Sequence, residues 1–428
     1  MDVTIIGGGL AGSEIALQLA SRGIPVELVE MRPEQGTPAH QTGALAELVC
    51  SNSLKSERPE TASGLFKREL ALLGCRLLEI ACGARVPAGH ALAVDRELFS
   101  RAVTEAVESE PLIRLERREQ IDLDLPGCSV VATGPLTSES LSKSLREHFG
   151  AENLHFYDAI SISIDADSVD HSRLYRASRY GKGGADYWNV PFSKDEYERL
   201  VEYLRAAPCA EKRGFEKSRC FEACLPVEVI ASSGAESLRF GPLKPKGLAD
   251  PETGREPHAV LQLRQETRDG GLLGLVGFQT RLTRPAQRKL PRPQQHNIGI
   301  GHVRWGSIHR NTFIDAPRLL DEGQMSRNRR GLFFSGQIVG VEGYVESIAH
   351  GLVTALNVER YLHGEGFVRF PRETLIGALQ EHLTGESRSY QPMNVNFGIV
   401  PPVDGPRKRR KELYARRSIE TLERFLST

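Results

Sequence analysis

The first 32 residues constrain the fold more than any other stretch of the sequence. They read as a β-branched strand over 3–6, a glycine-rich turn, an amphipathic helix over 10–21 and a second strand over 26–30. The turn has the spacing Gly7-x-Gly9-x-x-Gly12, and the second strand ends at Glu30. This order predicts an α/β fold of the Rossmann type that binds a dinucleotide.

Each of these residues has a mechanical reason to be where it is. Gly7 permits the tight turn, Gly9 lets the backbone approach a pyrophosphate, and Gly12 allows close packing of helix on strand. Glu30 is placed to accept hydrogen bonds from a ribose. The candidate cofactor-binding residues of this region are Gly7, Gly8, Gly9, Leu10, Ala11, Gly12, Glu30 and Arg32.

Two later stretches decide between NAD and FAD. "CSVVATGPLTS" (128–138) is an apolar strand that ends in Ala-Thr-Gly, and "GLFFSGQIVGVEGYVES" (331–347) is a strand, a Gly336-Gln337 turn and the start of a helix. Together with the early glycines, they resemble the two-part plan of flavoproteins related to glutathione reductase, whose late helix points its positive end at the flavin. We therefore expect FAD beside Gly336 and Gln337, although many of those flavoproteins have an acidic residue in place of Gln337.

Composition and cysteine usage bound the class of protein. A chain of 428 residues, 40% hydrophobic, can bury a core large enough for two or three domains. No window has the roughly 18 to 20 apolar residues of a membrane-spanning helix, and the start lacks the pattern of a signal peptide, so we expect a cytoplasmic protein without a membrane partner. The seven cysteines argue against a disulfide framework, and no second ligand pair joins Cys220 and Cys224, so no metal site is expected.

The remaining pattern divides the chain into four parts. We expect an FAD-binding domain in two parts (1–142 and 217–362), a smaller inserted domain (143–216) and a C-terminal helical basic segment (363–428). The insertion could be a dimer surface, a lid or a substrate platform. Further helices are predicted over 64–80, 96–108, 138–148, 194–206, 344–362, 373–383 and 410–427, and further strands over 128–132, 259–264, 273–278 and 332–335.

Residue chemistry alone leaves two thiols and one basic run undecided. Four cysteines lie where any apolar residue would serve, whereas Cys50 in "ELVCSNSLKS" and Cys224 in "FEACLPVEV" could be packing residues or functional thiols. The segment 405–417 holds seven basic residues, which fits either a phosphate-binding surface or a solvated helix face. The four cysteines with an expected structural role are Cys75, Cys82, Cys128 and Cys209.

Several long blocks resemble the folate- and FAD-dependent tRNA (uracil-5-)-methyltransferase family, often called TrmFO. The resemblance runs in order from Asp2 to roughly Tyr361. Two features depart from the family pattern: Val190 stands where a cysteine is expected, and 281–305 is more polar and richer in proline. The blocks include "GGGLAGSEIALQLASRGIPVELVEMRP", "TPAHQTGALAELVCSNSLKS", "SRYGKGGADYWNVP", "FEACLPVEVIA", "LRFGPLKPKGL", "VGFQT", "HRNTFI" and "SGQIVGVEGYVES".

The resemblance implies a reaction. Carbon 5 of a tRNA uridine, at position 54 in the T-loop, would be methylated with methylenetetrahydrofolate as carbon donor. Reduced FAD would carry the methylene and reduce it, and NADH or NADPH would recharge the flavin. Three alternatives remain: a ribosomal RNA methyltransferase of the same family, a NAD(P)H-dependent flavin oxidoreductase without an RNA substrate, and a non-catalytic RNA-binding flavoprotein.

The resemblance also implies roles for residues. Cys224 would add to carbon 6 of uracil, which turns carbon 5 into a nucleophile, and Cys50 would act near the flavin. The partner would be tRNA rather than DNA or a membrane, and the oligomeric state stays open. Residues expected around flavin, folate or RNA are Glu342, Tyr344, Glu346, Arg407, Lys408, Arg409, Arg410 and Lys411.

Overall fold

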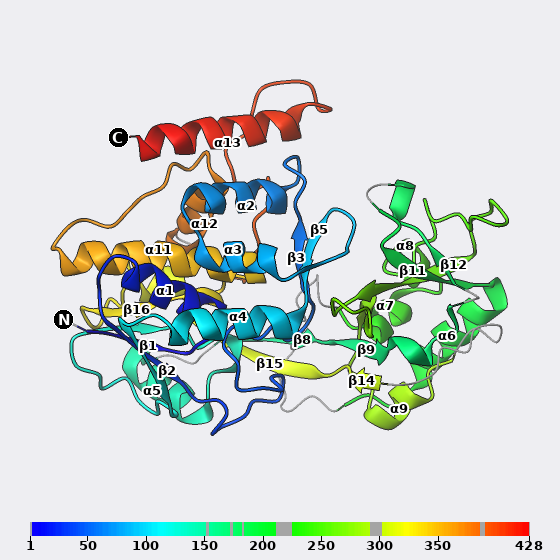
Figure 1. Cartoon of the computed structure of the whole chain (residues 1–428), viewed down its shortest axis with the longest axis horizontal. Helices are drawn as coiled ribbons and strands as arrows, with labels where there is room; N and C mark the ends of the chain where they lie inside the picture. The colour runs from blue at the N-terminus through cyan, green and yellow to red at the C-terminus, as the bar shows by residue number, and fades with distance from the viewer. Residues whose placement is uncertain are drawn as a thin grey trace.

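A five-stranded parallel sheet organises the first of two lobes (Figure 1). The computed structural model describes residues 2–150, 154–171, 174–181, 184–210, 225–291, 302–385 and 390–427. The sheet has the order β16-β7-β1-β2-β6, and β16 pairs with β7 although some 200 residues separate them in sequence. This arrangement confirms the predicted α/β fold. The strands are β1 (Val3–Ile6), β2 (Val26–Glu30), β6 (Ile113–Arg117), β7 (Cys128–Val131) and β16 (Leu332–Phe334).

Helices cover both faces of this sheet, and α11 (Tyr344–Leu362) packs along α1 (Leu10–Ala20). Figure 1 shows these two with α3 (Arg76–Gly83) and α4 (Arg96–Glu108) above the sheet and α5 (Glu139–Phe149) below it. The single helix predicted over 64–80 was wrong. Gly74 adopts a φ of +71° between α2 (Ala62–Leu72) and α3, which interrupts the helical path.

The second lobe is an antiparallel sheet with a core of its own. Its strand order is β10-β11-β12-β13-β9-β14, and α6 (Lys194–Ala206) and α7 (Val227–Ser233) pack in the same core. The predicted boundary at residue 216 lies outside the described residues, and in sequence it falls between β11 and β12, which are neighbours in this sheet. The strands are β9 (Ser161–Asp165), β10 (Tyr175–Arg176), β11 (Tyr187–Phe192), β12 (Ala259–Gln265), β13 (Leu272–Gln279) and β14 (His302–Arg304).

Two small sheets lie between the lobes (Figure 1). The chain enters and leaves the second lobe through the antiparallel pair β8 (Leu154–Ala159) and β15 (Ile308–Phe313). The other sheet contains β3 (Ser53–Ser56), β4 (Arg85–Val86) and β5 (Ala91–Val94). Short helices complete the set: α8 (Ser237–Phe240), α9 (Arg284–Arg288) and α10 (Ala316–Leu319).

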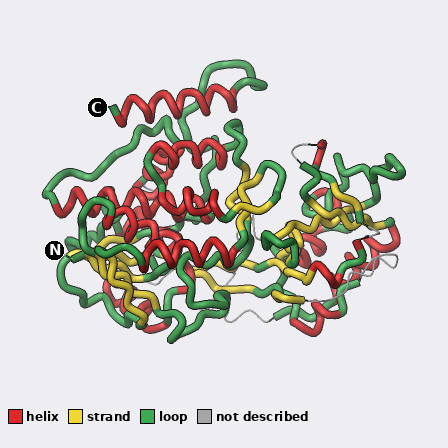
Figure 2. Tube along the Cα trace, in the orientation of Figure 1, coloured by secondary structure: helices red, strands yellow, loops and turns green. Residues whose placement is uncertain are grey.

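The C-terminal helices dock on α2 through one buried carboxylate. Glu69 accepts hydrogen bonds from the first backbone N–H groups of α12 (Leu375–Thr384) at 2.9 Å each, and it accepts a third from the Ser418 hydroxyl of α13 (Arg410–Leu426). Figure 2 shows α13 as the outermost helix of the first lobe. Across the described ranges, no helix is long and apolar enough to cross a membrane.

A buried, neutral histidine joins α11 to the end of β16. Nδ1 of His350 accepts a hydrogen bond from the backbone N–H of Gly336 at 3.2 Å and lies 2.9 Å from Ser335 Oγ. Because an N–H group can only donate, Nδ1 must be unprotonated. Burial lowers the pKa of His350 to about 3, which agrees with this assignment.

The low pKa makes the fold sensitive to acid. An unfolded histidine titrates near 6.5, so between pH 6.5 and 3 the unfolded chain binds a proton that the folded chain excludes. Stability should therefore fall as pH drops through this window, by up to about 1.4 kcal/mol per pH unit from this group. We expect His350→Asn, which keeps an acceptor but does not titrate, to flatten the slope in urea unfolding between pH 7.5 and 5. The exposed His363→Asn serves as control, and equal slopes for His350→Asn and the unchanged protein would contradict the assignment.

Candidate functional site

A pocket opens where β1, β2 and β7 end and where α1 and α11 begin. Its empty space is about 980 Å³, open solvent at the mouth included. Crevices at the carboxyl ends of parallel strands are the usual ligand sites of such sheets. Among the lining residues that the sequence singled out are Gly7, Gly9, Leu10, Ala11, Glu30, Arg32, Gln337 and Tyr344.

The turn between β1 and α1 shows why three glycines are spaced as they are. Gly7 has a φ of +102°, and a Cβ atom on Gly12 would lie 1.9 Å from the Gly7 carbonyl oxygen. A side chain at either position would break the turn. A Cβ atom on Gly9 would meet nothing within 4 Å, and Gly9 lines the pocket. The fold therefore needs Gly7 and Gly12, whereas the space beside Gly9 is open to a ligand.

Glu30 is held by its neighbours at the end of β2. Its Oε2 accepts the backbone N–H of Gly8 at 2.8 Å, and its Oε1 accepts both Nε and the backbone N–H of Arg32 at 2.9 and 3.0 Å. Burial alone would raise the pKa of Glu30, but the Arg32 guanidinium and these N–H donors hold it below its usual value. Glu30 is therefore an oriented anion at the pocket wall.

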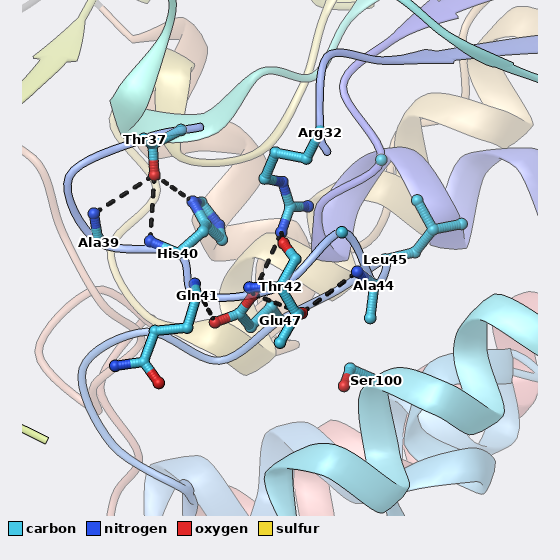
Figure 3. A network of polar contacts seen from close by, with 12 residues as sticks. Arg32, Thr37, Ala39, His40, Gln41, Thr42, Ala44, Leu45, Glu47 and Ser100 are labelled. Atoms are coloured by element: carbon cyan, nitrogen blue, oxygen red, sulfur yellow. Dashed lines mark hydrogen bonds and ion pairs between the residues drawn. The ribbon is translucent and has the colours of Figure 1, made fainter. Parts of the chain in front are cut away.

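Figure 3 shows the loop that follows, in which the Glu47 carboxylate makes several polar contacts. Its carboxylate accepts the backbone N–H groups of Gln41 and Thr42 at 2.9 and 3.0 Å and the Thr42 hydroxyl at 2.8 Å. It also pairs with Arg32 at 3.4 Å and with Arg304 of β14, in the second lobe, at 3.6 Å. One carboxylate thus joins this loop to both lobes.

The same loop ends at Cys50, which lies against the start of α11. The phenol oxygen of Tyr344 accepts the backbone N–H groups of Cys50 and Ser51 at 2.8 and 3.2 Å, and it lies 3.0 Å from Cys50 Sγ. Burial, together with the Cys50 thiol, raises the pKa of Tyr344 well above its usual range. Cys50 does not line the pocket, but its neighbour Val49 and Tyr344 both do.

Two glutamates near the start of α11 serve contacts within the protein. Glu346 is fully buried, and its Oε1 accepts Lys55 Nζ at 2.9 Å and the backbone N–H of Val395 at 3.2 Å. Glu342 accepts the side-chain amide of Gln337 at 2.8 Å. Neither glutamate lines the pocket. The sequence pattern predicted that both lie near the site, but it did not indicate whether they contact a ligand or the protein itself.

Sequence reasoning named only part of the pocket. Gly8, Gly12 and Gly336 support its wall without lining it, and Cys224, like Cys220, lies outside the described residues. The Ala-Thr-Gly end of β7 marks a flavoprotein plan in the sequence, and in the structure it also forms a wall of the pocket. The missed lining residues include Thr37, His40, Glu47, Arg118, Glu119, Gln120, Thr133, Pro135, Thr137 and Ser347.

The predicted basic surface spans the turn before α13 and the first two residues of that helix. All five of its side chains are exposed, and Arg409 pairs with Glu412 at 3.4 Å. Its members are Arg407, Lys408, Arg409, Arg410 and Lys411. On the second lobe, Val190 of β11 is fully buried in the core, where a side chain cannot reach a ligand. In the part of the chain that the structure describes, no group of three or more His, Cys, Asp or Glu could hold a metal ion.

Comparison with known proteins gives consistent matches. A family described as glucose inhibited division protein A matches residues 2–366. The protein named methylenetetrahydrofolate--tRNA-(uracil-5-)-methyltransferase TrmFO from Geobacter sulfurreducens is 51% identical over 430 residues, which span 100% of this chain and 99% of that protein. A protein of the same name from Aquifex aeolicus is 47% identical and covers 99% of this chain and 96% of its own length.

A solved structure shares the fold. The structure of Aquifex aeolicus GidA superposes with a TM-score of 0.72 and covers 99% of this chain and 73% of that one, at 17% identity. That likeness supports the fold alone, whereas identity near 50% over both full lengths shows the family. The chain belongs to the TrmFO family of methyltransferases, within the wider family described as glucose inhibited division protein A.

Proposed function

We propose that this protein methylates carbon 5 of uridine 54 in the T-loop of tRNA, with methylenetetrahydrofolate as carbon donor. The observation that carries the proposal is the 51% identity to a TrmFO methyltransferase over essentially the whole of both chains. The pocket and the Cys50 thiol near it support the flavin side of such a reaction. The exposed basic side chains at the start of α13 are suited to tRNA phosphates.

The pocket fits the adenosine pyrophosphate of FAD. The space beside Gly9 is open, and the first turn of α1 supplies the positive end of a helix for the pyrophosphate. Glu30 Oε2 accepts one protein donor, and a carboxylate oxygen can accept a second from a ribose hydroxyl. The Arg32 guanidinium forms an ion pair with the other carboxylate oxygen of Glu30, at 2.9 Å. Gln337 and Tyr344 also line the pocket and are our candidates for holding the isoalloxazine.

Reduced FAD supplies a carrier for the one-carbon unit and the hydride equivalent that makes it a methyl group, and NADH or NADPH restores the reduced flavin. The protein residues prepare the RNA base for that unit. A uracil carbon 5 is a weak nucleophile, and thiolate addition to carbon 6 makes it an enolate that attacks an electrophilic carbon. We assign that addition to Cys224, by family resemblance, and a role on the flavin side to Cys50, which lies beside the lining residue Tyr344.

The open space at Gly9 gives a test of the FAD site that leaves the fold intact. We expect Gly9→Val to fold normally, because its Cβ meets no protein atom, and to lose its flavin because the side chain occupies the pyrophosphate position. Visible absorption of the purified protein measures the bound flavin, and circular dichroism measures the fold. Gly12→Val is the matched contrast, since it should disturb the fold itself. Full flavin content in Gly9→Val would refute the assignment.

A direct assay tests the reaction and its substrate. Incubation with labelled methylenetetrahydrofolate, NADH or NADPH, and unmodified tRNA should label the RNA, and digestion should yield 5-methyluridine from position 54. A tRNA with cytidine at position 54 should stay unlabelled. Labelling of ribosomal RNA instead of tRNA would contradict the proposed substrate, and flavin reduction without labelling of any RNA would leave a simple oxidoreductase.

The two thiols can be separated with RNA that carries 5-fluorouracil at the target position, because fluorine prevents loss of the carbon 5 proton and traps the thiol adduct. We expect Cys224→Ala to form no covalent complex, and Cys50→Ala to form the complex but transfer no methyl group. Gel mobility of the complex and label transfer give the two readouts, with Cys220→Ala as an active control. The reverse pattern would exchange the two roles, and normal methylation by both variants would refute thiol catalysis.

A further inference from the structure

Within the described ranges, the phenol oxygen of Tyr344 has three polar neighbours, and all three belong to Cys50 and Ser51. They are the backbone nitrogens of Cys50 and Ser51, at 2.8 and 3.2 Å, and Cys50 Sγ, at 3.0 Å. Distance alone does not say whether the phenol or the thiol donates in the third contact. A count of donors and acceptors around the oxygen does.

A phenol has one hydrogen to donate and two lone pairs with which to accept. The two backbone N–H groups can only donate, so they take both lone pairs of the Tyr344 oxygen. The remaining hydrogen of the phenol therefore points to Cys50 Sγ. An oxygen that already accepts two hydrogen bonds is also a stronger donor, because such bonds polarise one another. The raised pKa of Tyr344 keeps this hydrogen on the phenol at neutral pH.

The donor is held in place by the fold. Tyr344 is the first residue of α11, a 19-residue helix that is buried over most of its length. The loop is fixed from the other side as well, because Ser51 Oγ accepts Arg264 Nη2 of β12 at 3.2 Å and the backbone N–H of Ser53 at 3.0 Å. The helix that carries the phenol and the loop that carries the thiol are thus each held by contacts of their own.

We propose that Tyr344 is a positioning residue that donates its phenolic hydrogen to Cys50 Sγ, orients the thiol and stabilises the thiolate. A hydrogen bond to a charged acceptor is stronger than one to a neutral acceptor, so the contact favours S⁻ over S–H. The proposal rests on the proposed function only for the use of that thiolate in methyl transfer. The hydrogen bond itself is tested on the thiol, without RNA or folate.

The test is the pH dependence of alkylation of Cys50 by iodoacetamide in the purified flavoprotein, followed by mass spectrometry of the Cys50 peptide. We expect the midpoint to rise by about one pH unit or more in Tyr344→Phe, which is a tenfold or larger loss of thiolate at neutral pH. The midpoint is the readout because intrinsic thiolate reactivity changes with pKa and distorts rates at a single pH. Cys82, which is exposed, is the internal reference, and Tyr361→Phe on the same helix is the matched control.

A second variant keeps the test decisive if Tyr344→Phe disturbs the loop. Site-specific 3-fluorotyrosine at position 344 keeps the shape of the side chain and makes the phenol more acidic, hence a stronger donor and a weaker acceptor. If Tyr344 donates, the Cys50 midpoint falls; an unchanged or raised midpoint overturns the proposal. A lowered midpoint in a protein that methylates no RNA would refute the proposed function while the hydrogen bond stands.

Discussion

The close crossing of α1 and α11 is the contact on which the rest of the site depends. A Cβ atom on Gly351 would lie 2.6 Å from the backbone oxygen of Ala11, and one on Gly336 would lie 2.7 Å from Ala11 Cβ. Larger residues would push the helices apart. Because both helices begin at the pocket, their separation sets how far the glycine turn lies from Tyr344. The distance between the proposed pyrophosphate site and the Cys50 thiol thus depends on small residues, Ala11, Gly336 and Gly351, that have no proposed part in the reaction.

The Cys50 loop has no regular structure between residues 31 and 52, so polar contacts position it. Glu47 pairs with Arg32 at the start of the loop and with Arg304 in the second lobe. Tyr344 and Arg264 then hold its end from α11 and from β12. The partners outside the loop, Arg264, Arg304 and Tyr344, come from three distant stretches of sequence. The loop can therefore adopt this arrangement only when both lobes are folded. The position of the Cys50 thiol thus depends on both lobes.

This dependence explains what the sequence could and could not predict. The helices over 96–108, 194–206 and 344–362 match residue for residue, because their amphipathic periodicity is contained within each segment. The helix over 64–80 was wrong because Gly74 ends a helix where the apolar pattern continues. The glycine turn and Glu30 follow a local pattern and were predicted to form one site, whereas the contact between Cys50 and Tyr344 spans 294 positions and has no local signal.

Buried carboxyl groups at helix starts also attach the C-terminal helices to the first lobe. Glu14 of α1 accepts the backbone N–H groups of Arg76 and Leu77 at the start of α3, as Glu69 of α2 does for α12. Each accepts the first backbone N–H groups of another helix, which have no partner within that helix. Glu69 also takes the Ser418 hydroxyl, so α13 is attached to the first lobe. The basic side chains at its start therefore keep a set position relative to the pocket.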